Sequence, residues 1–233
     1  MMTELTTYEG GWSKVCRDLD NHPQIKILHA SQGELDTGFT DVAASWAALV
    51  GEQEVKAPAA LEQCDLRFRE LGRQWMGEGR PYVNGEFYLT HLARAGSPGL
   101  GEEWIESWTG KELFPSSQLR VIDCHPITGT GHYAALRLLP GGDEPEIWWV
   151  AEPRYGAWKM DVGYPEYLEM LQLTKGAFSW QFLFTRAPLD NEEFEGVRDR
   201  MENMLDALPV LFPEHDYKPL TERFSARSSD RCS

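Results

Sequence analysis

The sequence from residue 119 to residue 161 decides the fold, and it reads LRVIDCHPITGTGHYAALRLLPGGDEPEIWWVAEPRYGAWKMD. Aliphatic, β-branched and aromatic residues form short runs here, separated by glycine- and proline-rich turns. Such a pattern is typical of short strands joined by tight connections. We therefore expect an antiparallel meander of four strands, over Leu119–Asp123, Tyr133–Leu139, Glu146–Ala151 and Ala157–Asp161.

The segment after the meander has a helical period. An apolar stripe predicts a helix that begins at Tyr164, and Pro165 suits its first turn. Asp190 and Glu193 form a capping-box pattern that opens a second helix, which we expect to end before Pro209. The residues of this helix that should face the core are Phe194, Val197, Met201, Leu205 and Leu208.

The N-terminal portion, to about residue 110, is predicted to be mainly helical. A short strand is expected over Ile25–Leu28, followed by a helix over Asp41–Val50 that Asp41 caps. A helix that stops at Gly77 is expected next, because apolar residues recur there every three or four positions. These apolar residues are Leu61, Cys64, Phe68, Leu71 and Trp75. Two shorter helices are predicted over Asn84–Ala95 and Glu102–Trp108.

Helices, then a meander, then helices are typical of an α+β protein. We expect a central, mainly antiparallel sheet of about four to six strands with helices packed around it. One domain is predicted over residues 1–224, and the small polar residues from 225 to 233 are predicted to form a disordered tail.

The chain is strongly acidic, with a net charge of −15 from 37 acidic and 22 basic side chains. A field of this sign repels nucleic-acid phosphates and anionic lipid headgroups, so neither class of partner is expected. Two interpretations stay open. The acidity keeps the protein soluble, or it attracts a basic protein partner.

Cysteine usage and the absence of a leader predict a cytoplasmic protein. The four cysteines lie far apart and form no CxxC motif, so neither a disulfide framework nor a zinc ribbon is expected. The N-terminus lacks the layout of a signal peptide, and no apolar run approaches the ~20 residues that span a bilayer.

One cluster of side chains could bind a metal or act in catalysis, namely Asp123, Cys124, His125 and His132. Its spacing matches no established metal site, and Cys124 and His125 are neighbours that a strand sends to opposite faces. The turn Gly129-Thr130-Gly131 lies between two strands and not before a helix, so it is not a phosphate loop. We therefore expect no catalytic residue, no metal and no cofactor.

Trp148 and Trp149 occupy the predicted strand Glu146–Ala151. Successive side chains of a strand point to opposite faces, so one ring should be buried while the other points outward or lies under a helix. Both rings could lie in a core that is covered on both faces, or one could be an aromatic anchor at an interface.

The stretch from residue 119 to residue 184 resembles the SUKH superfamily, which includes the fungal Smi/Knr cell-wall regulator and many bacterial immunity proteins. The resemblance rests on the glycine-containing turn Pro140-Gly141-Gly142-Asp143, the aromatic strand after it, and the motif Tyr164-Pro165-Glu166-Tyr167-Leu168. It implies an α+β fold without enzymatic activity or cofactor. It also implies a protein that neutralises a cognate toxin, often a nuclease.

We expect a non-catalytic cytoplasmic protein, a monomer or weak dimer, that neutralises a basic toxin domain of an interbacterial competition system. Alternatives are a regulatory or scaffold protein of the Smi/Knr type and a metal-dependent hydrolase that uses Asp123, His125 and His132. Acidic side chains should set the association rate and buried aromatic ones the affinity. The residues predicted to bind the partner are Asp143, Glu144, Glu146, Trp148, Trp149 and Glu152.

Overall fold

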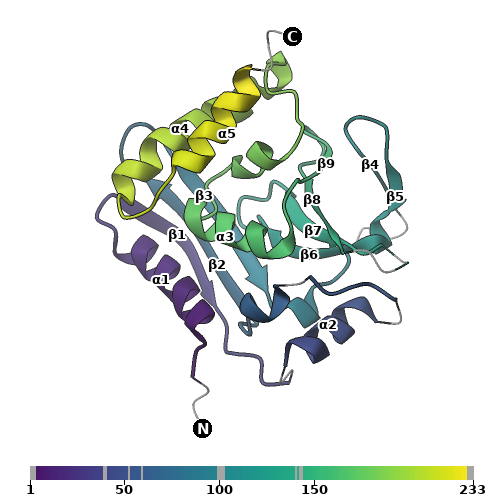
Figure 1. The fold of residues 1–233 in the computed structure, drawn as a ribbon. Helices are drawn as coiled ribbons and strands as arrows, with labels where there is room; N and C mark the ends of the chain where they lie inside the picture. Colours follow the sequence, from purple (N-terminus) through teal and green to yellow (C-terminus); the bar gives the residue numbers. More distant parts are fainter. Residues whose placement is uncertain are drawn as a thin grey trace.

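A computed structural model gives the arrangement of the chain (Figure 1). It describes residues 4–38, 41–51, 53–58, 60–98, 103–139, 141 and 144–229. Asp143, one of the predicted partner-binding residues, lies outside these ranges.

The protein is an α+β structure built on a seven-stranded antiparallel sheet, with strand order β1-β2-β3-β6-β7-β8-β9. The fold class and the antiparallel sheet are therefore confirmed, while the sheet has more strands than the four to six expected. The strands are β1 (Ile25–Gln32), β2 (Glu70–Gly77), β3 (Asn84–Thr90), β6 (Leu119–Cys124), β7 (Tyr133–Arg137), β8 (Glu146–Val150) and β9 (Ala157–Lys159).

The predicted meander is confirmed, because β6, β7, β8 and β9 are consecutive neighbours in the sheet. Ala134 faces Trp149 across the β7–β8 pair, and Trp149 in turn faces Trp158 across the β8–β9 pair. A register shift between Val121 and Asp123 interrupts the β6–β7 ladder, which lets β6 continue to Cys124.

Two helices predicted in the N-terminal portion are strands. The segment predicted as a helix from Leu61 to Trp75 contains only the short 3₁₀ turn η1 (Leu61–Gln63) before β2 begins at Glu70. The segment from Asn84 to Ala95 begins with β3 and ends in the 3₁₀ turn η2 (Leu92–Arg94). The expected strand at residue 25 is confirmed and is longer than predicted, since β1 extends to Gln32.

The third of these expected helices, over Glu102–Trp108, is also a strand. Trp104–Glu106 forms β4, which pairs with β5 (Leu113–Pro115) in a separate hairpin. The 3₁₀ turn η3 (Ser116–Gln118) then leads into β6.

In the described part of the chain, five α-helices accompany the sheet: α1 (Thr7–Asn21), α2 (Val42–Val50), α3 (Tyr164–Thr174), α4 (Glu195–Leu211) and α5 (Lys218–Ser229). Asp41 caps α2 as predicted, with its side chain accepting from the N–H of Ala44. The helix that begins at Tyr164 is confirmed as well. Two 3₁₀ turns, η4 (Trp180–Phe184) and η5 (Glu192–Phe194), lie between α3 and α4.

The last two helices differ from their predictions. The side chain that caps the turn before α4 belongs to Asn191 and not to Asp190. Helix α4 also continues through Pro209 to Leu211, because a proline near the end of a helix costs only one of its last hydrogen bonds. The predicted disordered tail is helical as far as Ser229, where α5 ends.

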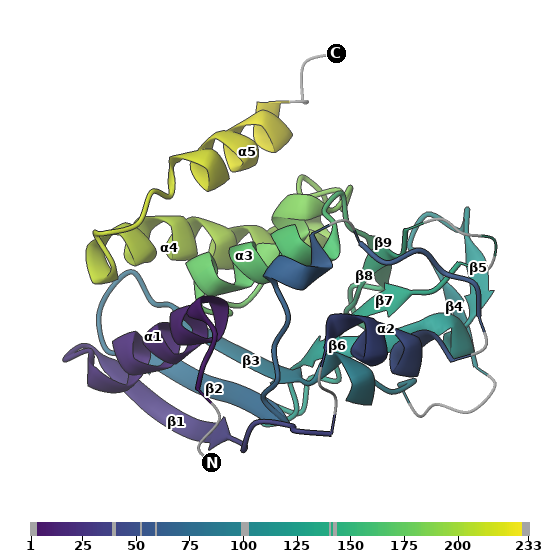
Figure 2. The ribbon, with the colours of Figure 1, turned by 60° about the horizontal axis from the view of Figure 1, so that its bottom comes forward.

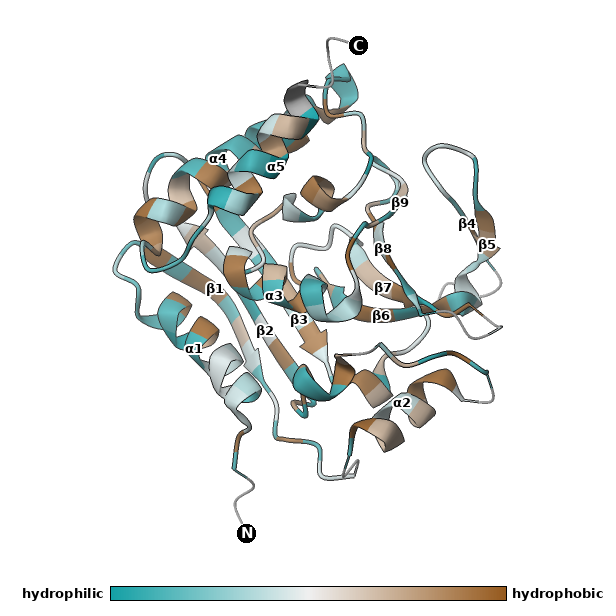
Figure 3. Cartoon of the chain, in the orientation of Figure 1, coloured by the Kyte–Doolittle hydropathy of each residue, from teal (hydrophilic) through white to brown (hydrophobic). Residues whose placement is uncertain are grey.

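Helices α1, α3 and α4 lie on one face of the sheet, and α5 packs outside α4 (Figure 2). The main core lies between this face and the helices, and its buried residues extend from Trp12 to Leu220. Apolar residues recur along the central strands, whereas hydrophilic residues prevail along α5 (Figure 3). No described helix has both the length and the apolar character needed to cross a membrane.

A second, smaller core lies on the other face of the meander, under the β4–β5 hairpin. Its buried residues are Ile105, Phe114, Leu119, Tyr133, Ala135, Trp148, Val150 and Ala157. The hairpin covers only part of this face, and the uncovered part is the floor of the largest cavity described below.

Candidate functional site

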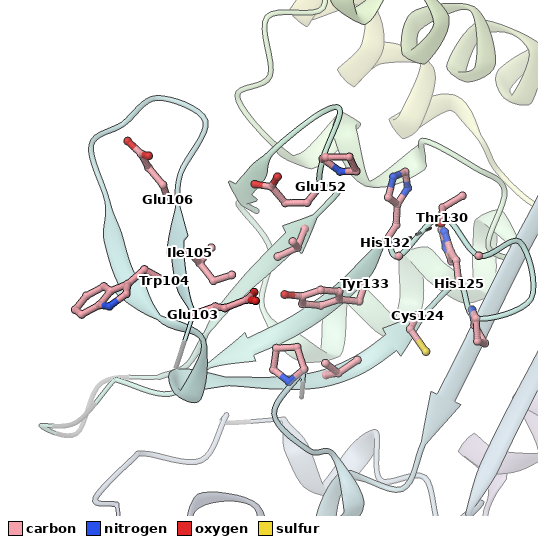
Figure 4. Close-up of a pocket in the computed structure, with 17 residues that line it drawn as sticks. Glu103, Trp104, Ile105, Glu106, Cys124, His125, Thr130, His132, Tyr133 and Glu152 are labelled. Carbon is pink, nitrogen blue, oxygen red and sulfur yellow. Dashed lines mark hydrogen bonds between the residues drawn. The ribbon is translucent and has the colours of Figure 1, made fainter. Parts of the chain in front are cut away.

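A cleft of about 810 Å³ opens between the β4–β5 hairpin and the face of β6–β8 that is turned away from the helices (Figure 4). The strands supply its floor, through Val121, Tyr133 and Val150. One wall is the hairpin, and the opposite wall is the loop between β6 and β7. The volume lies in the range of cavities that bind ligands or partner side chains.

Tyr133 lies at the centre of this floor. The alternation of β7 turns Ala134 toward the helices and Tyr133 toward the hairpin. Tyr133 is 8% exposed, and its hydroxyl has no hydrogen-bond partner among the described residues. Burial, together with the nearby carboxylates of Glu152 and Glu103, raises the pKa of Tyr133 to about 12. The cleft therefore presents a phenol that can still donate or accept one hydrogen bond.

Three carboxylates of the described residues line the cleft. Glu103 and Glu106 come from the hairpin, and Glu152 comes from the turn after β8. All three side chains are exposed, and no described cation pairs with any of them. Like charges gathered in a cleft with low-dielectric walls focus a negative potential that attracts cations.

The histidines on the opposite wall do not offset these charges. Burial, with His132 close by, lowers the pKa of His125 to about 3. Burial and the nearby Arg200 lower the pKa of His132 to about 4. Both imidazoles are therefore neutral at pH 7, and the charge that the described residues give the cleft is that of its glutamates.

The loop from β6 to β7 is held in place by Glu86 of β3. This carboxylate is 1% exposed, and it accepts hydrogen bonds from the N–H groups of Ile127 and Thr128, at 2.6 and 2.9 Å. Gly129 and Gly131 then take positive φ angles of 65° and 73°, which most other residues avoid. The glycines that suggest a phosphate loop therefore shape one wall of the cleft.

Exposed apolar side chains flank the acidic cleft. Trp104 on β4 is 62% exposed and Leu113 on β5 is 61% exposed. The two strands pair in antiparallel register, so both side chains belong to one hairpin. An exposed tryptophan beside unpaired carboxylates is the combination that anchors a protein partner.

The predicted aromatic anchors lie elsewhere. Trp148 and Trp149 are each 1% exposed, so the interpretation that both rings lie in a core covered on both faces is confirmed, and neither ring is an exposed aromatic anchor. Trp148 packs against Phe114 in the smaller core, with ring centroids 4.7 Å apart. Trp149 belongs to the main core on the other face. The alternation is as expected, but both faces of β8 are covered.

The predicted acidic residues separate into two groups. Glu152 lines the cleft, as described. Glu146 does not, because its carboxylate binds Lys159 at 2.5 Å, Arg137 at 3.3 Å and the indole N–H of Trp148 at 2.9 Å. Glu144 is exposed and lies 3.8 Å from Lys56, away from the lining of the cleft.

Of the residues weighed for catalysis, Cys124, His125 and His132 line the cleft, whereas Asp123 does not. Asp123 is fully buried and accepts from the N–H of Tyr88 and the hydroxyl of Tyr167, both at 2.8 Å. Burial, with Asp123 close by, raises the pKa of Cys124 to about 12, which disfavours the nucleophilic thiolate. Within the described ranges, the one group of His, Cys, Asp and Glu side chains spaced to hold a metal is Asp18, Glu214 and His215.

Glu103, Trp104, Glu106 and Tyr133 were not among the predicted binding residues. The first three were assigned to a helix that proves to be a hairpin. The alternation of exposed Trp104, buried Ile105 and exposed Glu106 is a strand pattern, and Gly110 marks the turn that follows. In the sequence Trp104 and Ile105 are both apolar, so this alternation is hidden there, and Gly110 is the signal that could have suggested the hairpin.

No family model matches the chain, and neither a curated protein nor a solved structure matches it significantly. The resemblance to the SUKH superfamily therefore stays a prediction.

Proposed function

We propose that this chain is a non-catalytic binding protein that docks a basic protein partner in the acidic cleft. The observation that carries the proposal is the buried, unpaired hydroxyl of Tyr133 between the carboxylates of Glu103 and Glu152. The phenol oxygen and the two carboxylates can each accept a hydrogen bond, which suits the several N–H donors of an arginine or lysine side chain.

The surroundings of this point fit the same partner. Trp104 offers an exposed indole on which a guanidinium or an apolar side chain can stack. Glu106 extends the negative charge along the hairpin. The net charge of −15 adds a long-range field that steers a basic molecule toward the protein.

We further propose that the partner is a toxin domain, often a nuclease in the family that the sequence resembles, and that the protein works in the cytoplasm as an immunity protein. Nucleases that bind anionic nucleic acid tend to be basic, which complements an acidic cleft. A regulatory or scaffold protein with another basic partner is the alternative, and it would use the same surface. The hydrolase alternative has less support, because Asp123 is buried away from the cavities that His125 and His132 line.

Co-expression tests this proposal. The toxin domain encoded by a neighbouring gene is expressed in bacteria, alone and with this protein, and growth and co-purification are scored. Wild-type protein should restore growth and co-purify, whereas the double variant Glu103→Lys, Glu152→Lys should do neither. The control is Glu202→Lys with Glu222→Lys, which makes the same charge change on α4 and α5, on the far side of the sheet.

Three results would count against the proposal. Growth without co-purification would mean that the protein does not act by binding. Rescue by the cleft variant would place the docking surface elsewhere. Toxicity that wild-type protein does not relieve would remove the toxin role for that gene and favour the scaffold alternative.

A further inference from the structure

A second cavity, of about 320 Å³, lies behind the loop wall of the acidic cleft. His125, Thr130 and His132 line both cavities, so they form the partition between them. The remaining lining residues come from β8, from the turn after it, from the segment before η4, from η4 itself and from α4, and they are Trp149, Arg154, Tyr155, Phe178, Ser179, Phe182 and Arg200.

The charge of this second cavity is opposite to that of the cleft. Its described lining contains two arginines and no carboxylate. Within the described ranges no Asp or Glu oxygen lies within 4.0 Å of Arg154 or Arg200. In a protein with 15 more acidic than basic side chains, two unpaired arginines at one cavity indicate a site for a negative charge.

The two arginines converge on one ring. The guanidinium carbon of Arg154 lies 5.1 Å from the ring centroid of Tyr155, and that of Arg200 lies 6.0 Å from the same centroid. Arg200 also donates from Nε to the hydroxyl of Ser179 at 2.8 Å, which fixes its orientation. Its terminal NH₂ groups make no hydrogen bond with a described residue, so they are free to hold an anion in the forked geometry that arginine favours.

His125 supplies an independent observation. Its side chain is 2% exposed, and neither ring nitrogen forms a hydrogen bond of good geometry with a described residue, although the backbone of Glu86 lies close enough to one of them for a weak one. A neutral imidazole carries one N–H donor and one acceptor, and buried polar groups of this kind are nearly always paired in folded proteins. The backbone of Glu86 can pair with only one ring nitrogen, so the other points to a ligand that completes it.

Rings enclose the same space. The ring of His125 lies 5.3 Å from Trp149 and 5.1 Å from Phe178, both edge-to-face. Tyr155 and Phe182 close the other side, with centroids 5.9 Å apart. Walls of this kind favour a flat, apolar body over a hydrated inorganic ion.

We propose that this second cavity binds a small planar organic anion, with its ring between the aromatic side chains and its carboxylate or phosphate on Arg154 and Arg200. His125 donates or accepts one further hydrogen bond to the ring or its substituent. The site is separate from protein docking in the cleft, although the loop that forms the partition could transmit occupancy of one cavity to the other.

Isothermal titration calorimetry of the full-length protein tests the site with four probes: benzoate, phenyl phosphate, inorganic phosphate and benzylammonium. We expect an aromatic anion to bind, and benzylammonium not to bind. If benzoate binds more tightly than phenyl phosphate, the natural anion is a carboxylate, and the reverse order indicates a phosphate ester. Loss of one charged contact should weaken the bound anion by about tenfold or more in Arg200→Gln.

Controls separate this site from general electrostatics and from misfolding. Arg198→Gln makes the same charge change two residues away on α4, outside the lining of the cavity, and should bind as wild type does. Arg154→Gln provides a second test at an exposed position if Arg200→Gln unfolds. The ¹⁵N resonances of the His125 ring should shift on binding in wild type.

Three results would overturn the proposal. One is no binding of either aromatic anion with a dissociation constant below about 10 mM. Another is equal weakening by Arg198→Gln and Arg200→Gln. The third is inorganic phosphate or benzylammonium binding as tightly as the aromatic anions.

Discussion

The hydroxyl of Tyr167 donates a hydrogen bond to the carboxyl of Asp123 across 2.8 Å, in a fully buried position between α3 and β6. The other oxygen of Asp123 accepts from the N–H of Tyr88 on β3. Asp123 therefore ties the helical layer to two neighbouring strands of the sheet directly before the loop that forms the cleft wall. No described cation pairs with it, and burial raises its pKa to about 7.

The raised pKa of Asp123 predicts that stability falls as the pH rises. Between the ordinary pKa of an aspartate, about 3.9, and the folded value of about 7, the folded state holds a proton that the unfolded state has lost. The free energy of unfolding should therefore decrease with pH in this window, by at most about 1.4 kcal/mol per pH unit from this group.

Asp123→Asn removes the carboxyl that binds this proton, so a comparison of the variant with wild type measures its contribution to stability. Urea unfolding of both proteins from pH 4.5 to pH 7.5 should show wild type losing stability relative to the variant as the pH rises. All other groups are shared, so their contributions cancel in the difference. A difference that does not change with pH would show that Asp123 titrates normally.

Glu86 is predicted to hold the loop of the cleft wall. Glu86→Gln keeps one acceptor and loses the other, so one of the two N–H groups, of Ile127 or Thr128, becomes unpaired. Loss of a buried hydrogen bond should lower the free energy of unfolding by about 1–3 kcal/mol. Amide exchange at Ile127 and Thr128 should accelerate as well. Glu78→Gln, at an exposed position, is the control and should leave both measurements unchanged.

Substitutions of Trp148 and Trp104 are expected to affect different properties, the first stability and the second partner binding. Trp148→Ala empties a position that is 1% exposed and should cost about 3–5 kcal/mol of unfolding free energy. Trp104→Ala, at 62% exposure, should change stability by no more than about 0.5 kcal/mol. The same Trp104→Ala should weaken partner binding by about 2 kcal/mol or more if the indole is an anchor. Comparable destabilisation by both substitutions would mean that Trp104 is a core residue.

The meander and α3 follow from their sequences because each of these elements carries two agreeing signals. The strands of the meander combine short apolar runs with glycine turns, and α3 combines an apolar stripe with Pro165 in its first turn. Local preference and tertiary structure agree in these segments, so pattern alone is sufficient.

The N-terminal strands could not be predicted in this way. Leu71 and Trp75 are four residues apart, which places them on one face of a helix and equally on one face of a strand. In β2, Leu71 and Trp75 alternate with Gly72 and Gln74. Arg73 lies between them, is buried, and forms an ion pair with Asp20. The helical interpretation depended on apolar residues recurring every three or four positions from Leu61 to Trp75, and η1 satisfies only the first of these steps, with a single 3₁₀ turn.

The formation of β3 depends on its packing against the C-terminal half of the chain. A Cβ on Gly85 would lie 2.5 Å from the carbonyl oxygen of Gly176, so this glycine allows the strand to approach the segment after α3. Such an approach joins residues about ninety positions apart and leaves no local signal. The same holds for part of the candidate site, since Glu103 approaches Tyr133 only through the position of the hairpin.

Association kinetics test most directly whether the acidic cleft docks the basic partner. The protein is mixed with the basic toxin domain that it neutralises on co-expression, and the association rate is measured from low to high salt. Two variants that change the charge equally are compared. One combines Glu103→Gln, Glu106→Gln and Glu152→Gln in the cleft, and the other combines Glu202→Gln, Asp206→Asn and Glu222→Gln on α4 and α5.

If the acidic cleft docks the partner, the cleft variant should associate about tenfold more slowly at low salt, and its association rate should depend less steeply on salt. The association rate of the control variant should stay close to that of wild type. Equal rates for the two variants would contradict docking in the cleft, because the acidic cleft would then be no more than one part of a uniformly negative surface.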